Sequence, residues 1–214
     1  MLALAILSEL ILLFGFFYGA VKLWKKGKPL YFQIIIAAIG CYALYQLLAI
    51  VMTFCDINEL YFNDGIFGLA GCYLLLFCAN RGSLDRLFDK PKTKYIVLSA
   101  LAGIVFLILC FVVATLYFGS FEHTYIIFIV AHLPACFVVY FNVKHLFTPE
   151  DPLGMIKGLR LTDICSLSFC VICLLDIAAW TNVEVISGVA DVILSLAALA
   201  LAFSAIKGAE KWNY

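Results

Sequence analysis

The chain of 214 residues is 65% hydrophobic and 13% charged, and its formal net charge is zero. Soluble domains contain roughly 45–50% apolar and about 25% charged residues, so this composition excludes an ordinary soluble protein. The neutral balance gives no indication of a nucleic-acid partner. Apolar stretches fill nearly all of the sequence and leave no room for a separate soluble catalytic domain.

We predict seven transmembrane helices, because a bilayer core about 30 Å thick requires roughly 20 apolar residues per crossing. Lysines follow the first apolar stretch instead of preceding it, so this stretch is a retained helix and not a cleaved signal peptide. The predicted fold is an all-α, seven-transmembrane helix bundle in one polytopic domain, residues 1–214. Its spans are 2–23, 31–54, 62–80, 95–118, 123–143, 159–180 and 185–206.

The loops between these spans alternate in charge. Lys and Arg occur in every second loop and in the C-terminal tail, and the intervening loops contain neither residue. The basic segments are 22–30, 81–94, 144–158 and 207–214, and the loops without a basic residue are 55–61, 119–122 and 181–184. Basic loops stay in the cytoplasm. We therefore expect a multi-pass protein of the cell membrane with its N-terminus outside and its C-terminus cytoplasmic.

The first two spans contain the first candidate site residues. Glu9 lies in the first span, and Tyr42 and Gln46 share a face of the second. The first span also has glycines at Gly15 and Gly19, one turn apart, a spacing that lets another backbone approach closely. We expect this motif to pack within the chain; the alternative is a homo-oligomer through Gly15 and Gly19.

The fifth span contains His132, two residues before Pro134. Proline removes a helical hydrogen bond and tends to kink the helix. A neutral imidazole beside such a kink is able to exchange protons with carboxylates. The alternative is a structural histidine that bonds a carbonyl group or a tyrosine.

The sixth and seventh spans are joined by only about four residues, so we expect them to be antiparallel neighbours. In the seventh span, Asp191 lies between Ser187 and Ser195 at four-residue spacing, which gives a narrow polar stripe. The sixth span carries a second stripe, within about 140° at 100° per residue. Its members are Asp163, Ser166, Cys170, Cys173 and Asp176.

Three acids, Glu9, Asp176 and Asp191, lie inside predicted spans, and no span has a Lys or Arg in its interior. A charge within the bilayer is costly, so such acids indicate a functional site. At 1.5 Å rise per residue, all three lie roughly 6–12 Å below the outer border. They are either protonated or bind a cation; the structural alternative is that each bonds a neighbouring helix.

The positions of the cysteines and the absence of known catalytic motifs limit the reactions that the chain is expected to catalyse. Most of the nine cysteines fall inside spans, where free cysteine behaves as a small hydrophobe. The pair Cys170-x-x-Cys173 is a weak indication of a redox or metal site, because no second pair accompanies it. The sequence contains no HExxH motif, nucleophile elbow or phosphate loop. We therefore expect no cofactor or metal, and an intramembrane hydrolase built on His132 is the weakest interpretation.

The predicted function is a small integral membrane transporter or ligand-binding protein with an acidic polar site in the outer half of the bundle. Its partners are the lipid bilayer and a small cation, a proton or a cationic small molecule. The alternative is a seven-helix membrane sensor or accessory subunit that signals through a separate cytoplasmic partner. The predicted ligand-binding residues are Asp191, Asp176, Glu9, Gln46, His132 and Tyr42.

Overall fold

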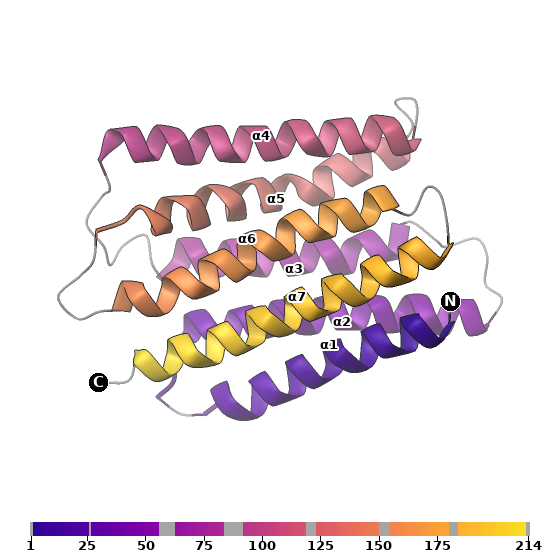
Figure 1. The fold of residues 1–214 in the computed structure, drawn as a ribbon, viewed down its shortest axis with the longest axis horizontal. Helices are drawn as coiled ribbons and strands as arrows, with labels where there is room; N and C mark the ends of the chain where they lie inside the picture. The colour runs from indigo at the N-terminus through magenta and orange to yellow at the C-terminus, as the bar shows by residue number, and fades with distance from the viewer. Residues whose placement is uncertain are drawn as a thin grey trace.

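The computed structural model describes residues 2–25, 27–55, 63–83, 92–118, 123–149, 155–179 and 184–212. Seven α-helices account for nearly all of this described part. They are α1 (Leu2–Leu23), α2 (Leu30–Phe54), α3 (Asn63–Ser83), α4 (Thr93–Phe118), α5 (His123–Leu146), α6 (Met155–Ala179) and α7 (Glu184–Lys211). The helices run alongside one another, and the two termini lie at opposite ends of the bundle, as an odd number of crossings requires (Figure 1).

The helices are those of a multi-pass membrane protein. Within the described residues, six of them are long and apolar enough to cross a bilayer, and α3 has a shorter apolar stretch, Phe67–Arg81. Large hydrophobic side chains are exposed on all seven helices, among them Val21 on α1 at 67% and Leu175 on α6 at 63%. A bilayer covers such a surface, whereas exposing it to water would be unfavourable and would promote aggregation. The predicted all-α membrane bundle is confirmed.

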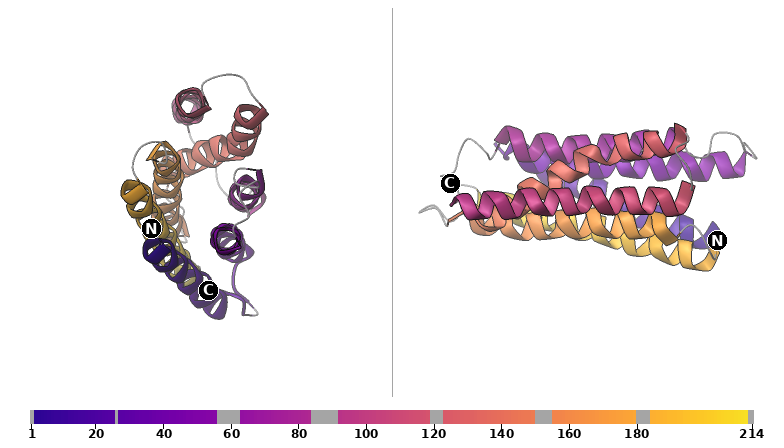
Figure 2. Two further views of the ribbon diagram at one scale, coloured as in Figure 1. Left: turned by 90° about the vertical axis from the view of Figure 1, so that its right-hand side faces the viewer. Right: turned by 90° about the horizontal axis from the view of Figure 1, so that it is seen from above.

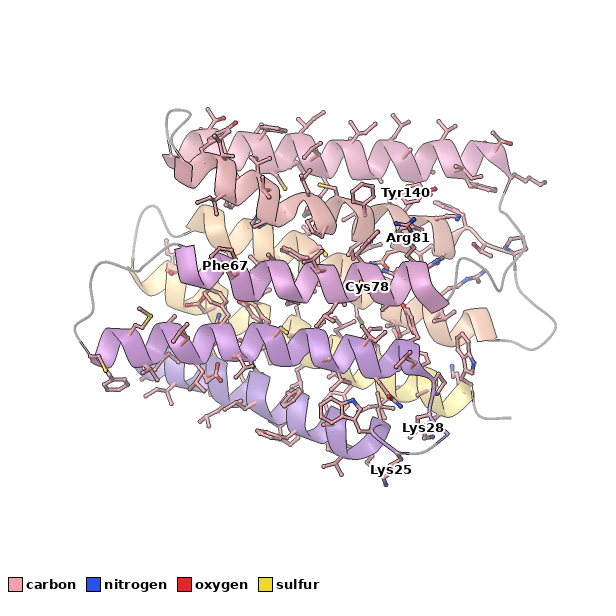
Figure 3. All side chains as sticks on the ribbon, turned by 180° about the vertical axis from the view of Figure 1, so that it is seen from behind. Lys25, Lys28, Phe67, Cys78, Arg81 and Tyr140 are labelled. Atoms are coloured by element: carbon pink, nitrogen blue, oxygen red, sulfur yellow. The ribbon has the colours of Figure 1, made fainter. Side chains whose placement is uncertain are left out.

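The predicted boundaries differ most where α5, α6 and α7 reach the end of the bundle that carries the basic residues. These helices continue to Leu146, start at Met155 and continue to Lys211, beyond the apolar spans. A helix can continue beyond its apolar stretch into the headgroup region. There, long basic side chains keep their apolar stems against apolar surface and extend their charged ends toward water. We call this end the basic end; Lys25, Lys28 and Arg81 lie toward it (Figure 3).

The opposite end, where α1 begins and α2 ends, is called the acidic end. Six helices form a ring in which the neighbours are α1–α2, α2–α3, α3–α5, α5–α6, α6–α7 and α7–α1. The remaining helix, α4, lies outside this ring against α5 and α6 (Figure 2). The expected pairing of α6 with α7 is confirmed. The ring places α1, α2, α6 and α7 around one polar region near the acidic end.

The glycine motif of α1 is used inside the bundle. A Cβ on Gly15 would lie 3.3 Å from the Leu199 side chain of α7, and one on Gly19 would overlap Ile36 of α2. The two glycines therefore let α1 approach two different helices of the same chain, as small residues do between membrane helices.

Candidate functional site

Ser8 of α1 connects three helices inside the bundle, in the half nearer the acidic end. Its side chain is fully buried. The Ser8 hydroxyl lies 2.5 Å from the Ser195 hydroxyl of α7 and donates to Gln46 Oε1 of α2 at 3.1 Å. Ser195 donates in turn to the Asp191 carbonyl one turn earlier, at 2.8 Å. These bonds hold the N-terminal halves of α1 and α7 against the C-terminal half of α2.

The Gln46 amide is oriented by its partners. Its oxygen accepts from Ser8, and its Nε2 donates to the Tyr42 hydroxyl at 2.8 Å. The Gln46 side chain also forms a hydrogen bond with the Asp191 carboxylate. An amide has two N–H donors and one carbonyl, so this arrangement uses both ends of the group. Gln46 therefore links α1, α2 and α7 and sets the position of the Asp191 carboxylate.

Asp176 of α6 faces the same region. Its side chain is 4% exposed, and its Oδ1 has no hydrogen-bond partner within the described residues. Asp176 and Asp191 lie close enough for their charges to interact, and the buried Tyr42 hydroxyl lies within electrostatic range of both. Cys173, one turn from Asp176, also lies within electrostatic range of both carboxylates. The structure thus brings together two of the three predicted acids, and we call Asp176 and Asp191 the carboxylate pair.

Glu9 lies in the same layer but on a different face. Its side chain is 5% exposed, and neither carboxylate oxygen has a hydrogen-bond partner among the residues described. Glu9 is two turns before Phe16, whose ring fills the space beside Gly40 of α2, so Glu9 is directed toward α2. Among the residues that the structure describes, the electrostatic partners of Asp176 and Asp191 do not include Glu9. Glu9 is therefore adjacent to the carboxylate pair without being part of it.

His132 of α5 is fully buried. Its Nδ1 bonds the Phe128 carbonyl at 2.8 Å, so this nitrogen is the protonated donor. The ring stacks on Phe128 at 4.1 Å and contacts the Tyr73 ring at 5.5 Å. Tyr73 in turn contacts Cys173. The carbonyl bond matches the structural alternative, and Tyr73 is the link between His132 and the site.

The chain matches no protein-family model, and no significant match was found among curated proteins or solved structures. The chemistry of the site has to be argued from its own residues.

Two carboxylates, an amide, a phenol and serine hydroxyls surround the site. These are hard oxygen donors, which suit protons, alkali ions and ammonium groups better than soft transition metals. Among the described residues there is no group of three side chains with metal-ligand geometry, and all nine cysteines are free thiols. No Lys or Arg lies within the interior of a helix span to neutralise the carboxylate pair.

A groove of about 760 Å³ lies elsewhere, between α3, α4 and α5. Its lining is almost entirely apolar, with Arg81 and Tyr140 near the basic end (Figure 3). None of the residues of the carboxylate pair or its partners lines it. It faces the outside of the ring, so it is a lipid-facing feature and separate from the polar site.

Sequence reasoning missed Ser8 and Tyr73. Ser8 is a single hydroxyl next to Glu9 in an apolar span, and its position beside the acid was the one available signal. Tyr73 lies in the short third span, where nothing in the spacing distinguishes a site tyrosine from an aromatic core residue.

Proposed function

We propose that this protein is a small transporter of the cell membrane that binds a monovalent cation at the carboxylate pair, Asp176 and Asp191. One observation carries the proposal. Two acids on adjacent helices converge inside the bundle, and none of the described residues beside them is basic. Two desolvated carboxylates repel each other, so one or both need a proton or another cation.

The neighbouring groups support a cation ligand over an anion. Tyr42 and Gln46 supply oxygen atoms, and the Gln46 amide holds the Asp191 carboxylate in place. Asp176 Oδ1 is buried with no partner in the described part of the chain, so it is able to accept a bond from a proton or an ammonium group, or to ligate an alkali ion. A bound cation removes the repulsion and satisfies this oxygen in one step.

Binding is tested by thermal unfolding of the protein in nanodiscs. The probes are Na⁺, K⁺ and methylammonium, with N-methyl-D-glucamine chloride holding the ionic strength constant. A ligand at 100 times its Kd stabilises the folded state by about 2.7 kcal/mol, which raises Tm by roughly 5–10 °C for a protein of this size. We expect at least one probe to give a saturable rise.

The same measurement on variants localises the site. Asp191→Asn and Asp176→Asn keep the side-chain shape and delete the charge, so we expect each to abolish the rise in Tm. Glu210→Gln is the matched control, because Glu210 is exposed at the basic end. Binding should weaken as the pH falls, since protonation removes the anion that attracts the cation. A response that survives in both aspartate variants contradicts the proposal.

Transport is separated from sensing by a flux measurement. In proteoliposomes, a transporter moves the cation that stabilises it, and Asp191→Asn abolishes this flux. Cation binding without flux favours the alternative, a membrane sensor or accessory subunit that signals through a separate cytoplasmic partner.

A further inference from the structure

A second buried polar cluster lies between α2, α3, α5 and α6, near the basic end. Its centre is an acid–base pair: Asp163 of α6 is fully buried, and its Oδ1 lies 3.5 Å from Nδ1 of His145 on α5. His145 is 6% exposed. The two residues are eighteen positions apart in the sequence, and no motif connects them.

Three further side chains extend this pair across the bundle. The Tyr31 hydroxyl of α2 donates to Asn80 Oδ1 of α3 at 3.2 Å, and Asn80 Nδ2 donates to Asn142 Oδ1 of α5 at 3.0 Å. Asn142 is one turn before His145, and Tyr31 lies within electrostatic range of Asp163. The chain of hydrogen bonds therefore begins near Asp163, at Tyr31, and ends near His145, at Asn142. It joins four helices.

Several polar atoms of the cluster have no hydrogen-bond partner among the described residues, although their side chains are less than a tenth exposed. They are Asn142 Nδ2, both ring nitrogens of His145, Thr162 Oγ1, both carboxylate oxygens of Asp163 and Ser166 Oγ. Buried polar groups in native proteins are nearly always paired, often by internal water. Donors and acceptors occur together here, so the cluster suits a ligand that both donates and accepts, such as water carrying a proton.

The helix α6 presents one acid to each polar region. Asp163 and Asp176 are thirteen residues apart, which is about 20 Å along the helix at 1.5 Å per residue. The residues of the predicted stripe between them are also buried: Ser166 at 3%, Cys170 at 0% and Cys173 at 2%. Polar and thiol groups thus follow the inner face of α6 from one acid to the other.

We propose that the His145–Asp163 pair is a hydrated proton-binding site, and that protons pass between this site and the carboxylate pair, where they compete with the bound cation. The second part of this proposal, the exchange with the carboxylate pair, rests on the proposed function. In the neutral ring with its proton on Nδ1, the atom that lies 3.5 Å from Asp163 Oδ1, the lone pair of Nε2 accepts a proton from a hydronium ion. Water is released, and the pair becomes an imidazolium next to a carboxylate. Loss of the same proton restores the starting state.

Among the described groups around the His145–Asp163 pair, none competes with it as the proton acceptor. Tyr31 faces it from α2, α3 contributes the neutral Asn80, and Arg160 lies one turn away on α6, where it donates to the Thr148 carbonyl at 3.3 Å. Lys144 of α5 lies over the Phe141 ring. The charged side chains of α4 and α7 at this end are exposed to the outside: Lys92, Lys94, Lys207, Glu210 and Lys211.

The test is infrared difference spectroscopy of the protein in nanodiscs after a change of pH. We expect imidazole and carboxyl bands that titrate in the unmodified protein. His145→Gln should remove the imidazole band, and Asp163→Asn should shift or remove it, because the imidazolium loses its partner. Ser204→Ala is the control; Ser204 is equally buried and bonds only its own helix, at Leu201 O. Titration unchanged in both pair variants overturns the proposal.

A proton-flux measurement in proteoliposomes with a pH-sensitive dye inside tests the second part. We expect Asp163→Asn and His145→Gln each to lower flux driven by a pH gradient at least tenfold. The carboxylate pair is judged separately, through the loss of cation stabilisation in Asp191→Asn. If Asp163→Asn does not fold, His145→Gln decides. Flux that persists in the His145 variant overturns the proton pathway but leaves the cation site standing.

Discussion

Ser8 contributes one hydroxyl proton to three neighbouring oxygen atoms. The Ser8 hydroxyl lies within hydrogen-bond distance of Gln46 Oε1, Ser195 Oγ and the Asp191 carbonyl. One hydroxyl has a single donor and two lone pairs, so these contacts share the proton. The residue fixes the Gln46 amide and, through it, the Asp191 carboxylate.

We predict that Ser8→Ala lowers the free energy of unfolding by about 0.5–1.5 kcal/mol, because it leaves the Gln46 carbonyl without its donor. It should also weaken the cation response, since the amide is less well held. Steric trapping in bicelles measures the first effect. Ser99→Ala is the control: Ser99 is fully buried, and its hydroxyl donates to the Tyr95 carbonyl of its own helix at 2.7 Å. An equal loss in both variants contradicts the role of Ser8.

The helices were largely predictable because each one is a continuous apolar stretch, and a membrane leaves few alternatives to a helix. The stripe on α6 was also predictable, since a 100° rotation per residue is enough to place Asp163 and Asp176 on one face. The partners of the stripe were not. The contact of His145 with Asp163 could not be predicted, because the sequence shows which face of α6 is polar but not which helix lies opposite that face.

The carboxylate pair illustrates the same limit. Depth along the membrane follows from counting residues, which placed Glu9, Asp176 and Asp191 in one layer. The direction of a side chain around the helix axis decides what it contacts, and here Ser8, not Glu9, forms the hydrogen bonds of this layer to α7. A difference of one residue is a rotation of about 100°, so depth alone could not separate the two.

The contact between α2 and α3 gives a prediction at the scale of whole helices. A Cβ on Gly68 would overlap Tyr45 Cβ and lie 3.3 Å from the Cys41 carbonyl oxygen. A Cβ on Gly71 would lie 3.9 Å from Cys41 Sγ and 4.0 Å from Cys41 Cβ. The first position opposes atoms close to the α2 backbone, which cannot rotate away. The second is in ordinary van der Waals contact.

Gly68→Ala should therefore lower the free energy of unfolding by about 1–3 kcal/mol, a typical effect of overpacking. Tyr45 contacts Tyr42 at 5.8 Å between ring centres, so displacement of α2 should also weaken cation binding. Gly71→Ala on the same helix is the control, and its stability should be unchanged or slightly raised, because alanine is the better helix former. Equal tolerance of both substitutions contradicts the close approach of α2 and α3.

At the scale of the molecule, α4 is the helix whose place was least predictable. All seven spans are apolar, and a helix that faces lipid on most sides resembles one that faces protein. The structure pairs α3 directly with α5 and leaves α4 outside. This arrangement closes the ring around both polar regions, so α2, α3, α5 and α6 meet at the basic end and α1, α2, α6 and α7 meet nearer the acidic end.

The direction of the proposed cation transport depends on the orientation of the bundle, and labelling of the native Cys55 measures this orientation. Cys55 is exposed directly after α2, at the acidic end. Cys78 is also exposed, but it lies on the apolar outer face of α3 (Figure 3). Maleimides react with the thiolate, which forms poorly away from water. A membrane-impermeant maleimide added to intact cells should therefore modify Cys55 alone.

Cys55→Ser should abolish this labelling, and adding Lys25→Cys to that variant gives the reporter for the basic end, where Lys25 is exposed. We expect Lys25→Cys to be labelled only after the membrane is permeabilised, because basic loops stay cytoplasmic. That result places the carboxylate pair in the outer half and His145–Asp163 in the inner half. Labelling of Lys25→Cys in intact cells, with Cys55 protected, would reverse the orientation and exchange the two sides of the pathway.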